Sequence, residues 1–131
     1  MTIMALGLAL VAFAVSGVAV DGTRAFLARR TLQNAADASA LAGASELDRE
    51  LYYASSGTTV ALDPDAARRV ALEWLARCGV GTRASVLADT SVVRVALHDE
   101  VATSFLGLMG IQMIPVTADA SAEPLGGSGA P

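Results

Sequence analysis

The side chains that could carry acid–base, nucleophilic or metal chemistry are few in this chain and stand apart. His98 is the only histidine, so a catalytic triad or a multi-histidine metal site lacks its partners, and we expect His98 at a turn or a helix entry. Two carboxylate pairs, Asp63/Asp65 and Asp99/Glu100, stand where helices are expected to begin, and the helix dipole accounts for them. The sequence therefore predicts no enzyme, no catalytic residues, no cofactor, no metal and no small-molecule substrate.

Composition narrows the class further. The 131 residues are 53% hydrophobic but only 5% aromatic, which favours closely packed helices rich in Ala, Val and Leu in one small domain. All nine basic residues are arginines, they are scattered, and the net charge is −4, so nucleic acid is not an expected partner. Cys78 is the only cysteine; we expect it to be buried as a small apolar residue, with an intermolecular disulfide as the alternative.

The N-terminal segment is apolar enough to cross a membrane. Eighteen uncharged residues run from Ile3 to Val20 and would span about 27 Å as a helix, close to the thickness of a hydrocarbon core. We predict a single-pass membrane anchor over residues 1–20, in contact with lipid; a cleaved signal peptide and a buried helix of a soluble protein are the alternatives. The expected lipid-facing side chains are Ile3, Leu6, Leu8, Leu10, Val11, Phe13, Val15, Val18 and Val20.

The charges beside this segment bear on its orientation. Arg24, Arg29 and Arg30 all follow it, and the positive-inside rule would place that side in the cytoplasm. An exported C-terminal domain is then at odds with the rule. One hypothesis that reconciles the two is a natural chain that begins upstream of Met1.

Strong helix formers fill residues 21–51, interrupted only by Gly22 and Gly43. We predict one helix that continues the anchor outward to about Leu51. Small and apolar side chains recur along it at helical spacing, a pattern typical of close helix–helix contact, either with another subunit or with the protein's own domain. These residues are Phe26, Leu27, Thr31, Asn34, Ala35, Ala38, Leu41, Ala42 and Ser45.

Residues 52–123 are predicted to form a small α+β exterior domain. The Tyr52–Asp63 stretch is expected to be a loop, with a short strand at Thr58–Leu62 as an alternative. Asp63 is a good N-cap and Pro64 a good first residue for a helix that ends at Gly79. Its predicted inner face, with Trp74 as the core anchor, comprises Ala67, Val70, Ala71, Trp74, Leu75 and Cys78.

A β-hairpin, a short helix and a last strand are expected to follow. The hairpin joins Ala84–Ala88 to Ser91–Leu97, and alternation predicts an edge strand over Met113–Glu123, with Pro115 near its start. Between them, Asp99 or Thr103 could cap a helix reaching Met109, with its apolar residues Val101, Phe105, Leu108 and Met109 facing inward. Residues 124–131 are predicted to be a disordered tail. The sheet is expected to pack on one or two helices, including the long N-terminal one.

One motif behind the apolar segment goes beyond these general patterns. The run VDGTRAFLARRTLQNAADASALAGA, residues 20–44, resembles the N-terminal signature of the TadE/TadG-like pilus-assembly proteins of the bacterial Flp (Tad) pilus system. With the anchor, the motif covers about a third of the chain. The elements that carry the resemblance are Asp21, Gly22, Arg24, Gln33, Asn34, Ala35, Ala36, Asp37 and Ala38.

The resemblance implies a pilin-like, minor-pilin or pseudopilin arrangement. In such proteins the N-terminus is inside, one helix lies in the membrane, and a small domain lies outside at the cell surface. The motif residues would then contribute to packing against other pilin-like subunits or pilus-assembly proteins. No Glu occupies the apolar segment, where major pilins carry one, and no prepilin leader is visible, so peptidase processing and entry into a filament stay open. A scaffold outside any filament and a secreted protein are the alternatives.

Overall fold

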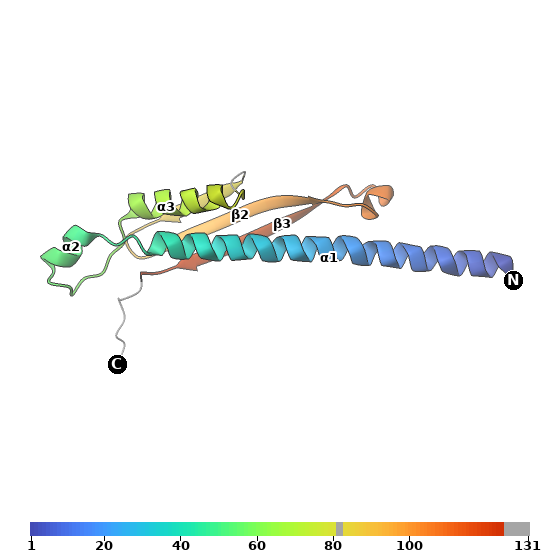
Figure 1. The fold of residues 1–131 in the computed structure, drawn as a ribbon, viewed down its shortest axis with the longest axis horizontal. Helices are drawn as coiled ribbons and strands as arrows, with labels where there is room; N and C mark the ends of the chain where they lie inside the picture. Colours follow the sequence, from blue (N-terminus) through green and yellow to red (C-terminus); the bar gives the residue numbers. More distant parts are fainter. Residues whose placement is uncertain (81–82, 125–131) are drawn as a thin grey trace, which may run out of the picture.

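The computed structural model describes residues 1–80 and 83–124. A long helix, α1 (Thr2–Ala44), spans most of the length of the molecule, and its N-terminal end projects beyond the other elements (Figure 1). In chain order these are α2 (Arg49–Ala54), α3 (Pro64–Arg77), β1 (Ala84–Ala88), β2 (Val93–Ala102), the 3₁₀ helix η1 (Leu106–Met109) and β3 (Met113–Ala122). The predicted α+β class, with its order of helix, hairpin, short helix and strand, is confirmed.

The helix α1 ends earlier than the sequence suggested. It stops at Ala44, so the prediction of one helix to about Leu51 is wrong at that end. The chain turns because Asp48 caps the separate helix α2, its carboxylate accepting the Leu51 N–H at 3.0 Å. Leu47 also forms an isolated antiparallel bridge with Leu62. Helix α2 therefore occupies the start of the expected 52–63 loop, and a full strand at 58–62 is not formed.

The three strands form one antiparallel sheet in the order β1-β2-β3. Val95 of the central strand lies opposite Val86 on one side and Ala120 on the other, which puts the apolar residues of all three strands on one face. The predicted hairpin is confirmed, and its turn is closed by Asp89, whose Oδ1 accepts the N–H groups of Ser91 at 2.7 Å and Val92 at 2.9 Å. β3 is an edge strand, as Pro115 indicated.

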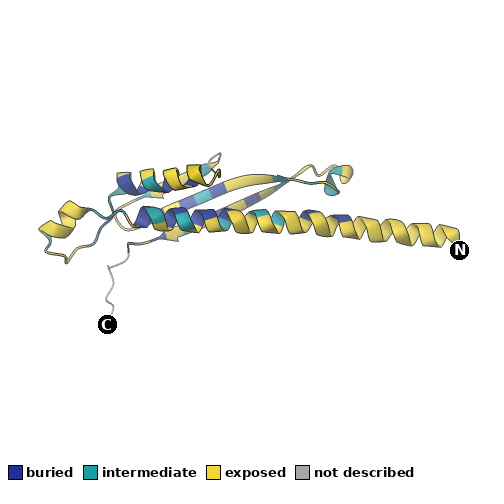
Figure 2. Ribbon diagram, viewed as in Figure 1, coloured by how far each residue is buried: buried dark blue, intermediate teal, exposed yellow. Residues whose placement is uncertain are grey.

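Helices α1 and α3 both pack on that apolar face and leave the other face of the sheet open (Figure 2). The residues that meet between them are small, so the low aromatic content does not leave a gap. The two helices come close at Gly43 of α1: a Cβ there would lie 2.9 Å from the Ala67 carbonyl oxygen and 3.3 Å from the Ala71 Cβ. The buried apolar core consists of Leu32, Ala35, Ala36, Ala40, Ala44, Leu62, Ala67, Ala71, Leu75, Val86, Val93, Val95, Leu97, Val116, Ala118 and Ala122.

Helix α3 follows its predicted bounds but not its predicted packing. Asp63 caps it as expected, accepting the Asp65 and Ala66 N–H groups at 3.1 Å. The Trp74 side chain is 37% exposed and Cys78 is exposed, so the predictions of a Trp core anchor and a buried cysteine are wrong. Because α3 approaches α1 through alanines, only a narrow stripe is buried, and both residues lie outside it.

The region between β2 and β3 also differs from the prediction. β2 continues to Ala102, so His98 lies within a strand opposite Thr117 and does not begin a helix. The short helix is the single turn η1, and its Leu108 and Met109 are 84% and 75% exposed, not inward-facing. The strands extend past the sheet's contact with α3, which removes the core that these side chains were expected to face. The predicted tail lies, apart from Pro124, outside the described residues.

The contact at Gly43 predicts opposite effects for two glycine-to-alanine changes on α1. Gly43→Ala adds a methyl group against the Ala67 backbone, and we expect it to lower the free energy of unfolding by about 1–3 kcal/mol. Gly22→Ala meets nothing within 4 Å and should raise it by about 0.5–1 kcal/mol through helix propensity. Urea titrations in mild detergent, followed by Trp74 fluorescence, measure both. A gain of stability in Gly43→Ala would contradict the close contact.

Candidate functional site

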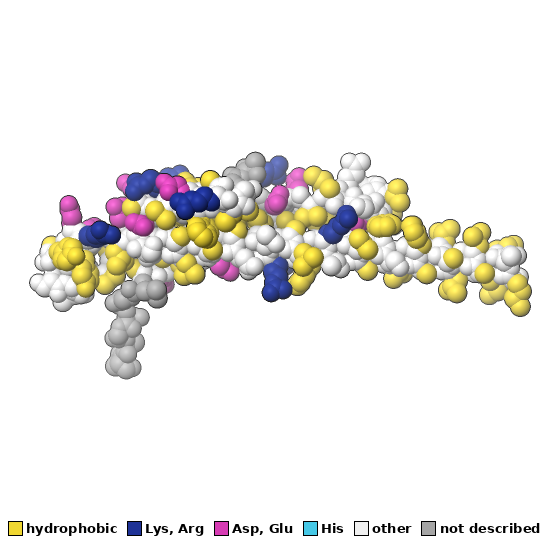
Figure 3. Space-filling model, viewed as in Figure 1, with side chains coloured by type: hydrophobic (Ala, Val, Ile, Leu, Met, Phe, Trp, Pro, Cys, Tyr) yellow, Lys and Arg dark blue, Asp and Glu magenta, His cyan; other side chains and the backbone are white. Residues whose placement is uncertain are grey.

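The N-terminal end of α1 projects beyond the domain as an apolar rod. Its most apolar window of 18 residues has a mean hydropathy of 2.5, and only 6% of that window is buried. All of the side chains predicted to face lipid, from Ile3 to Val20, are exposed. Figure 3 shows hydrophobic side chains along this part of α1 and no charged ones on the face in view. By length and composition the helix can cross a membrane, and the described residues do not enclose it.

Asp21, the first charged residue after the apolar run, is buried, with 1% of its surface exposed. Its carboxylate accepts three backbone N–H groups from the chain after β2: Ser104 at 2.9 Å, Phe105 at 2.8 Å and Leu106 at 2.8 Å. These amides have no partner of their own because they begin a helical turn. Asp21 therefore fastens the segment between β2 and β3 to α1 across more than eighty residues of sequence.

The surroundings of Asp21 favour its charged form. The N–H groups of Leu106 and Ser104 hold its pKa below the ordinary 3.8; burial acts in the opposite direction, and Phe105 N–H and Arg24 lower the pKa further. Arg24, one turn along α1, donates from Nη1 to the Ser104 hydroxyl oxygen at 2.7 Å. The carboxylate and the guanidinium thus hold the same short segment.

The contact between α1 and the segment after β2 continues from Asp21 toward the N-terminus, into the apolar run. The Phe105 ring lies over Gly17, where a Cβ would come within 2.6 Å of the Phe105 Cγ, so only glycine fits. Phe13 meets the same ring edge-on, with centroids 5.6 Å apart and planes at 72°. Phe13, Gly17 and Asp21 are spaced four residues apart and share one face of α1. We call residues 103–112 the β2–β3 tip, and its attachment through Gly17, Asp21 and Arg24 the Asp21 clamp.

Reasoning from the sequence missed the role of the tip and of Gly17. The usable signal was the stretch from Val101 to Ala118, which is uncharged and contains Gly107 and Gly110, a pattern typical of a tight loop. A lone buried Asp beside an apolar segment also needs a partner, and nothing local supplies three donors.

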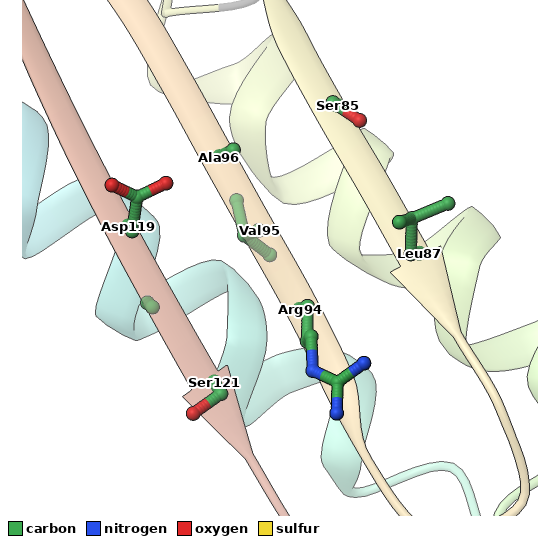
Figure 4. Close-up of a pocket in the computed structure, with 8 residues that line it drawn as sticks. Ser85, Leu87, Arg94, Val95, Ala96, Asp119 and Ser121 are labelled. Atoms are coloured by element: carbon green, nitrogen blue, oxygen red, sulfur yellow. The ribbon is translucent and has the colours of Figure 1, made fainter.

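The open face of the sheet carries a shallow concavity of about 400 Å³. Figure 4 shows Arg94 and Asp119 on neighbouring strands there, with Ser85, Leu87 and Ser121 nearby and the helices behind the sheet. Its lining contains no histidine or cysteine. Across residues 1–80 and 83–124, no group of three or more His, Cys, Asp or Glu could hold a metal ion.

Comparison with known proteins places the N-terminal part of the chain. Residues 1–46 match the family model Tad, described as "Putative Flp pilus-assembly TadE/G-like". The chain is TadE/G-like over this segment. The predicted resemblance is thereby confirmed. No curated protein and no solved structure matches the chain.

The TadE/G-like motif divides between two faces of α1. Asp21 and Arg24 belong to the clamp, and Gln33 donates from Nε2 to the Asp119 carbonyl oxygen of β3 at 2.9 Å. Ala35 and Ala36 are buried in the core. These five residues join the helix to its own domain, which is the alternative that the sequence left open. Gly22, Asn34 and Asp37 are exposed and Ala38 is half-buried, and their expected part in subunit packing stays a prediction.

The side of α1 opposite the domain is free in the described structure. Two large apolar side chains on it, Leu27 and Leu41, are exposed. Between and beyond them lie small or polar residues at the same helical spacing, so the face is smooth along its length: Thr31, Asn34, Ala38 and Ser45. We call these six positions the outer face of α1.

The clamp predicts a local effect for Asp21→Asn. The amide presents one acceptor oxygen and an NH₂ group toward three N–H donors, so we expect the tip to detach from α1 while the sheet and α3 remain folded. Hydrogen exchange of the full chain in detergent should show protection of Ser104–Leu106 falling about tenfold or more. Asp37→Asn is the matched control, because that exposed carboxylate accepts only from Gln33 at 3.0 Å. Equal protection in both variants would contradict the clamp.

The same carboxylate should make the tip sensitive to acid. Because the pKa of Asp21 is lowered in the folded protein, its stabilising effect is present above the unfolded value of 3.8 and is lost as the pH falls through the lower folded value. The pKa of Asp89 is also lowered, chiefly by the Ser91 hydroxyl. The pH dependence of global unfolding would therefore combine the contributions of Asp21 and Asp89. Exchange of the Ser104–Leu106 amides, corrected for intrinsic rate, should therefore accelerate below about pH 4. Asp21→Asn should abolish this dependence.

Proposed function

We propose that this protein is a membrane-anchored, pilin-like component of a Tad/Flp-type pilus assembly that works by packing the outer face of α1 against other subunits. One observation carries the proposal: the TadE/G-like segment is a single helix whose inner face packs on its own domain, while most of its apolar half and its outer face are exposed in the described chain. The family's pilus-assembly role supports a structural or assembly function over catalysis.

Helix packing suits the residues that the outer face presents. Small side chains such as Ala38 and Ser45 allow two helix backbones to approach closely, and Leu27 and Leu41 supply apolar area at either end. The helix is also held straight against its own sheet, so little conformational entropy is lost when it packs on a second helix. Other pilus components, minor-pilin or pseudopilin-like, are the proposed partners.

The proposed location is the cell membrane, with the α+β domain on the extracytoplasmic side and exposed at the cell or pilus surface. The apolar half of α1 and the family resemblance support this arrangement. Arg24 is one of the three arginines that argue against this orientation. Its guanidinium donates a hydrogen bond to the Ser104 hydroxyl close to the anchor.

Cysteine cross-linking in cells that produce the complete pilus system tests the proposal. In a Cys78→Ser background, Leu27→Cys and Leu41→Cys place a thiol on the outer face, and Leu72→Cys places one at an exposed site on α3. We expect at least fivefold more cross-linking to pilus components from the α1 positions than from Leu72→Cys.

Fractionation of the same cells separates the alternatives. Adducts of a chain that retains its apolar segment, found in the membrane or in sheared filaments, would support the proposal. A mature form that begins near Asp21 and accumulates in the medium would replace it with a secreted protein. Cross-links confined to membrane proteins outside the pilus system would indicate a membrane-tethered scaffold.

A further inference from the structure

We propose that the β2–β3 tip lies within the membrane beside α1, so that the protein contacts lipid through two elements that are far apart in sequence. The occupant of its exposed apolar surface is then lipid, in the leaflet nearest Asp21. This inference rests on the proposed membrane anchoring of α1. It concerns a part of the chain outside the 1–46 segment that matches the family.

The first argument is depth. Phe105 packs on Gly17 and Phe13, which precede Asp21 by four and eight residues. At 1.5 Å per residue, these contacts lie about 6 Å and about 12 Å below Asp21 along the helix axis. The run from Ile3 to Val20 is barely long enough for a hydrocarbon core, so all of it is needed to span the membrane. A tip attached at Gly17 and Phe13 therefore enters the same hydrocarbon layer.

The second argument is the surface of the tip. Leu108 is the most exposed large apolar residue of the exterior domain described, and Met109 and Ile111 beside it are also exposed. Figure 3 shows hydrophobic side chains at the end of the domain, next to those of the N-terminal part of α1. No charged residue occurs between Val101 and Ala118, so no charge would have to be desolvated.

The space between the tip and the anchor is apolar as well. A groove of about 620 Å³ runs between them. It could hold part of an acyl chain, and its walls include Leu10, Phe13, Val18, Phe105, Leu106 and Met109. The groove continues the exposed surface of the anchor, and this continuity favours lipid over a separate protein partner.

The third argument is the backbone. Irregular chain within a membrane must satisfy its own N–H groups, because hydrocarbon offers no acceptor. Asp21 accepts those of residues 104–106, and the N–H groups of Thr103, Leu108, Gly110 and Ile111 donate to carbonyl oxygens within the tip. The Thr103 hydroxyl adds a bond to the Ile111 carbonyl oxygen. At least seven of the ten residues from 103 to 112 thus have a bonded N–H without help from water.

Depth-dependent fluorescence quenching tests the proposal on the full chain. A bimane probe is placed on Leu108→Cys in a Cys78→Ser background, in phosphatidylcholine vesicles whose acyl chains carry bromine. Val15→Cys reports the anchor, and Tyr53→Cys reports the exposed far end of the domain. We expect bromine to quench the Leu108 and Val15 probes at least twofold more than the Tyr53 probe, and aqueous iodide to show the reverse order. Met109→Cys is a second tip position.

The outcomes separate the tip from the anchor. Bromine quenching at Leu108 and Met109 supports the proposal. Iodide quenching at both, with Val15 still quenched by bromine, would place the tip in water and overturn it while leaving the anchor intact. Shielding of both tip probes from both quenchers would mean that protein covers the tip, which also overturns it. Iodide quenching at Val15 would instead refute the membrane anchoring on which the inference rests.

Discussion

The arrangement of this protein depends on the Asp21 carboxylate and on the three backbone N–H groups that donate hydrogen bonds to it. Without Asp21, the turn at Ser104–Leu106 would present three N–H groups beside an apolar helix without the carboxylate that accepts them. With it, the extended end of the β2–β3 hairpin is bound to α1 far from the core. The sheet therefore touches α1 at two distant places, through the alanine-rich core and through the clamp, which fixes its alignment along the helix.

Because the domain is attached to α1 at two places, the two faces of the helix have different roles, as do its two halves. One face is used by the protein itself, from Gly17 through Gly43, with small residues wherever the sheet or α3 comes close. The opposite face carries Leu27 and Leu41 and has no part in the fold. Residues of the TadE/G-like motif lie on both faces. The same few turns of α1 therefore pack on the domain and also present an exposed surface.

Features set by local pattern were predictable from the sequence, whereas those set by distant contacts were not. The apolar run, the Asp63 cap with Pro64, and the alternation of Val93, Val95 and Leu97 all report on neighbouring residues. Each predicted the type of its element, helix or strand, although β2 begins at Val93 and continues to Ala102. The prediction for residues 103–112 was wrong because their apolar residues fit a helical period. The contact that positions Phe105 is with Gly17, more than eighty residues away in the sequence. The prediction that Trp74 is buried was wrong because neither helix sequence alone shows how closely α1 and α3 approach each other. Asp21 was singled out, but its partners were not.

The continuity of α1 also has a mechanical consequence. Its 43 residues contain no break, so the membrane half and the domain half behave as one rod of about 65 Å. Transmembrane helices tilt by about 20° on average, and a tilt of this size about the middle of the apolar run would displace the Ala44 end by about 17 Å. A neighbour that reoriented the helix inside the bilayer would thus swing the whole domain. In the proposed membrane location, the protein would act as a lever whose short arm lies in lipid.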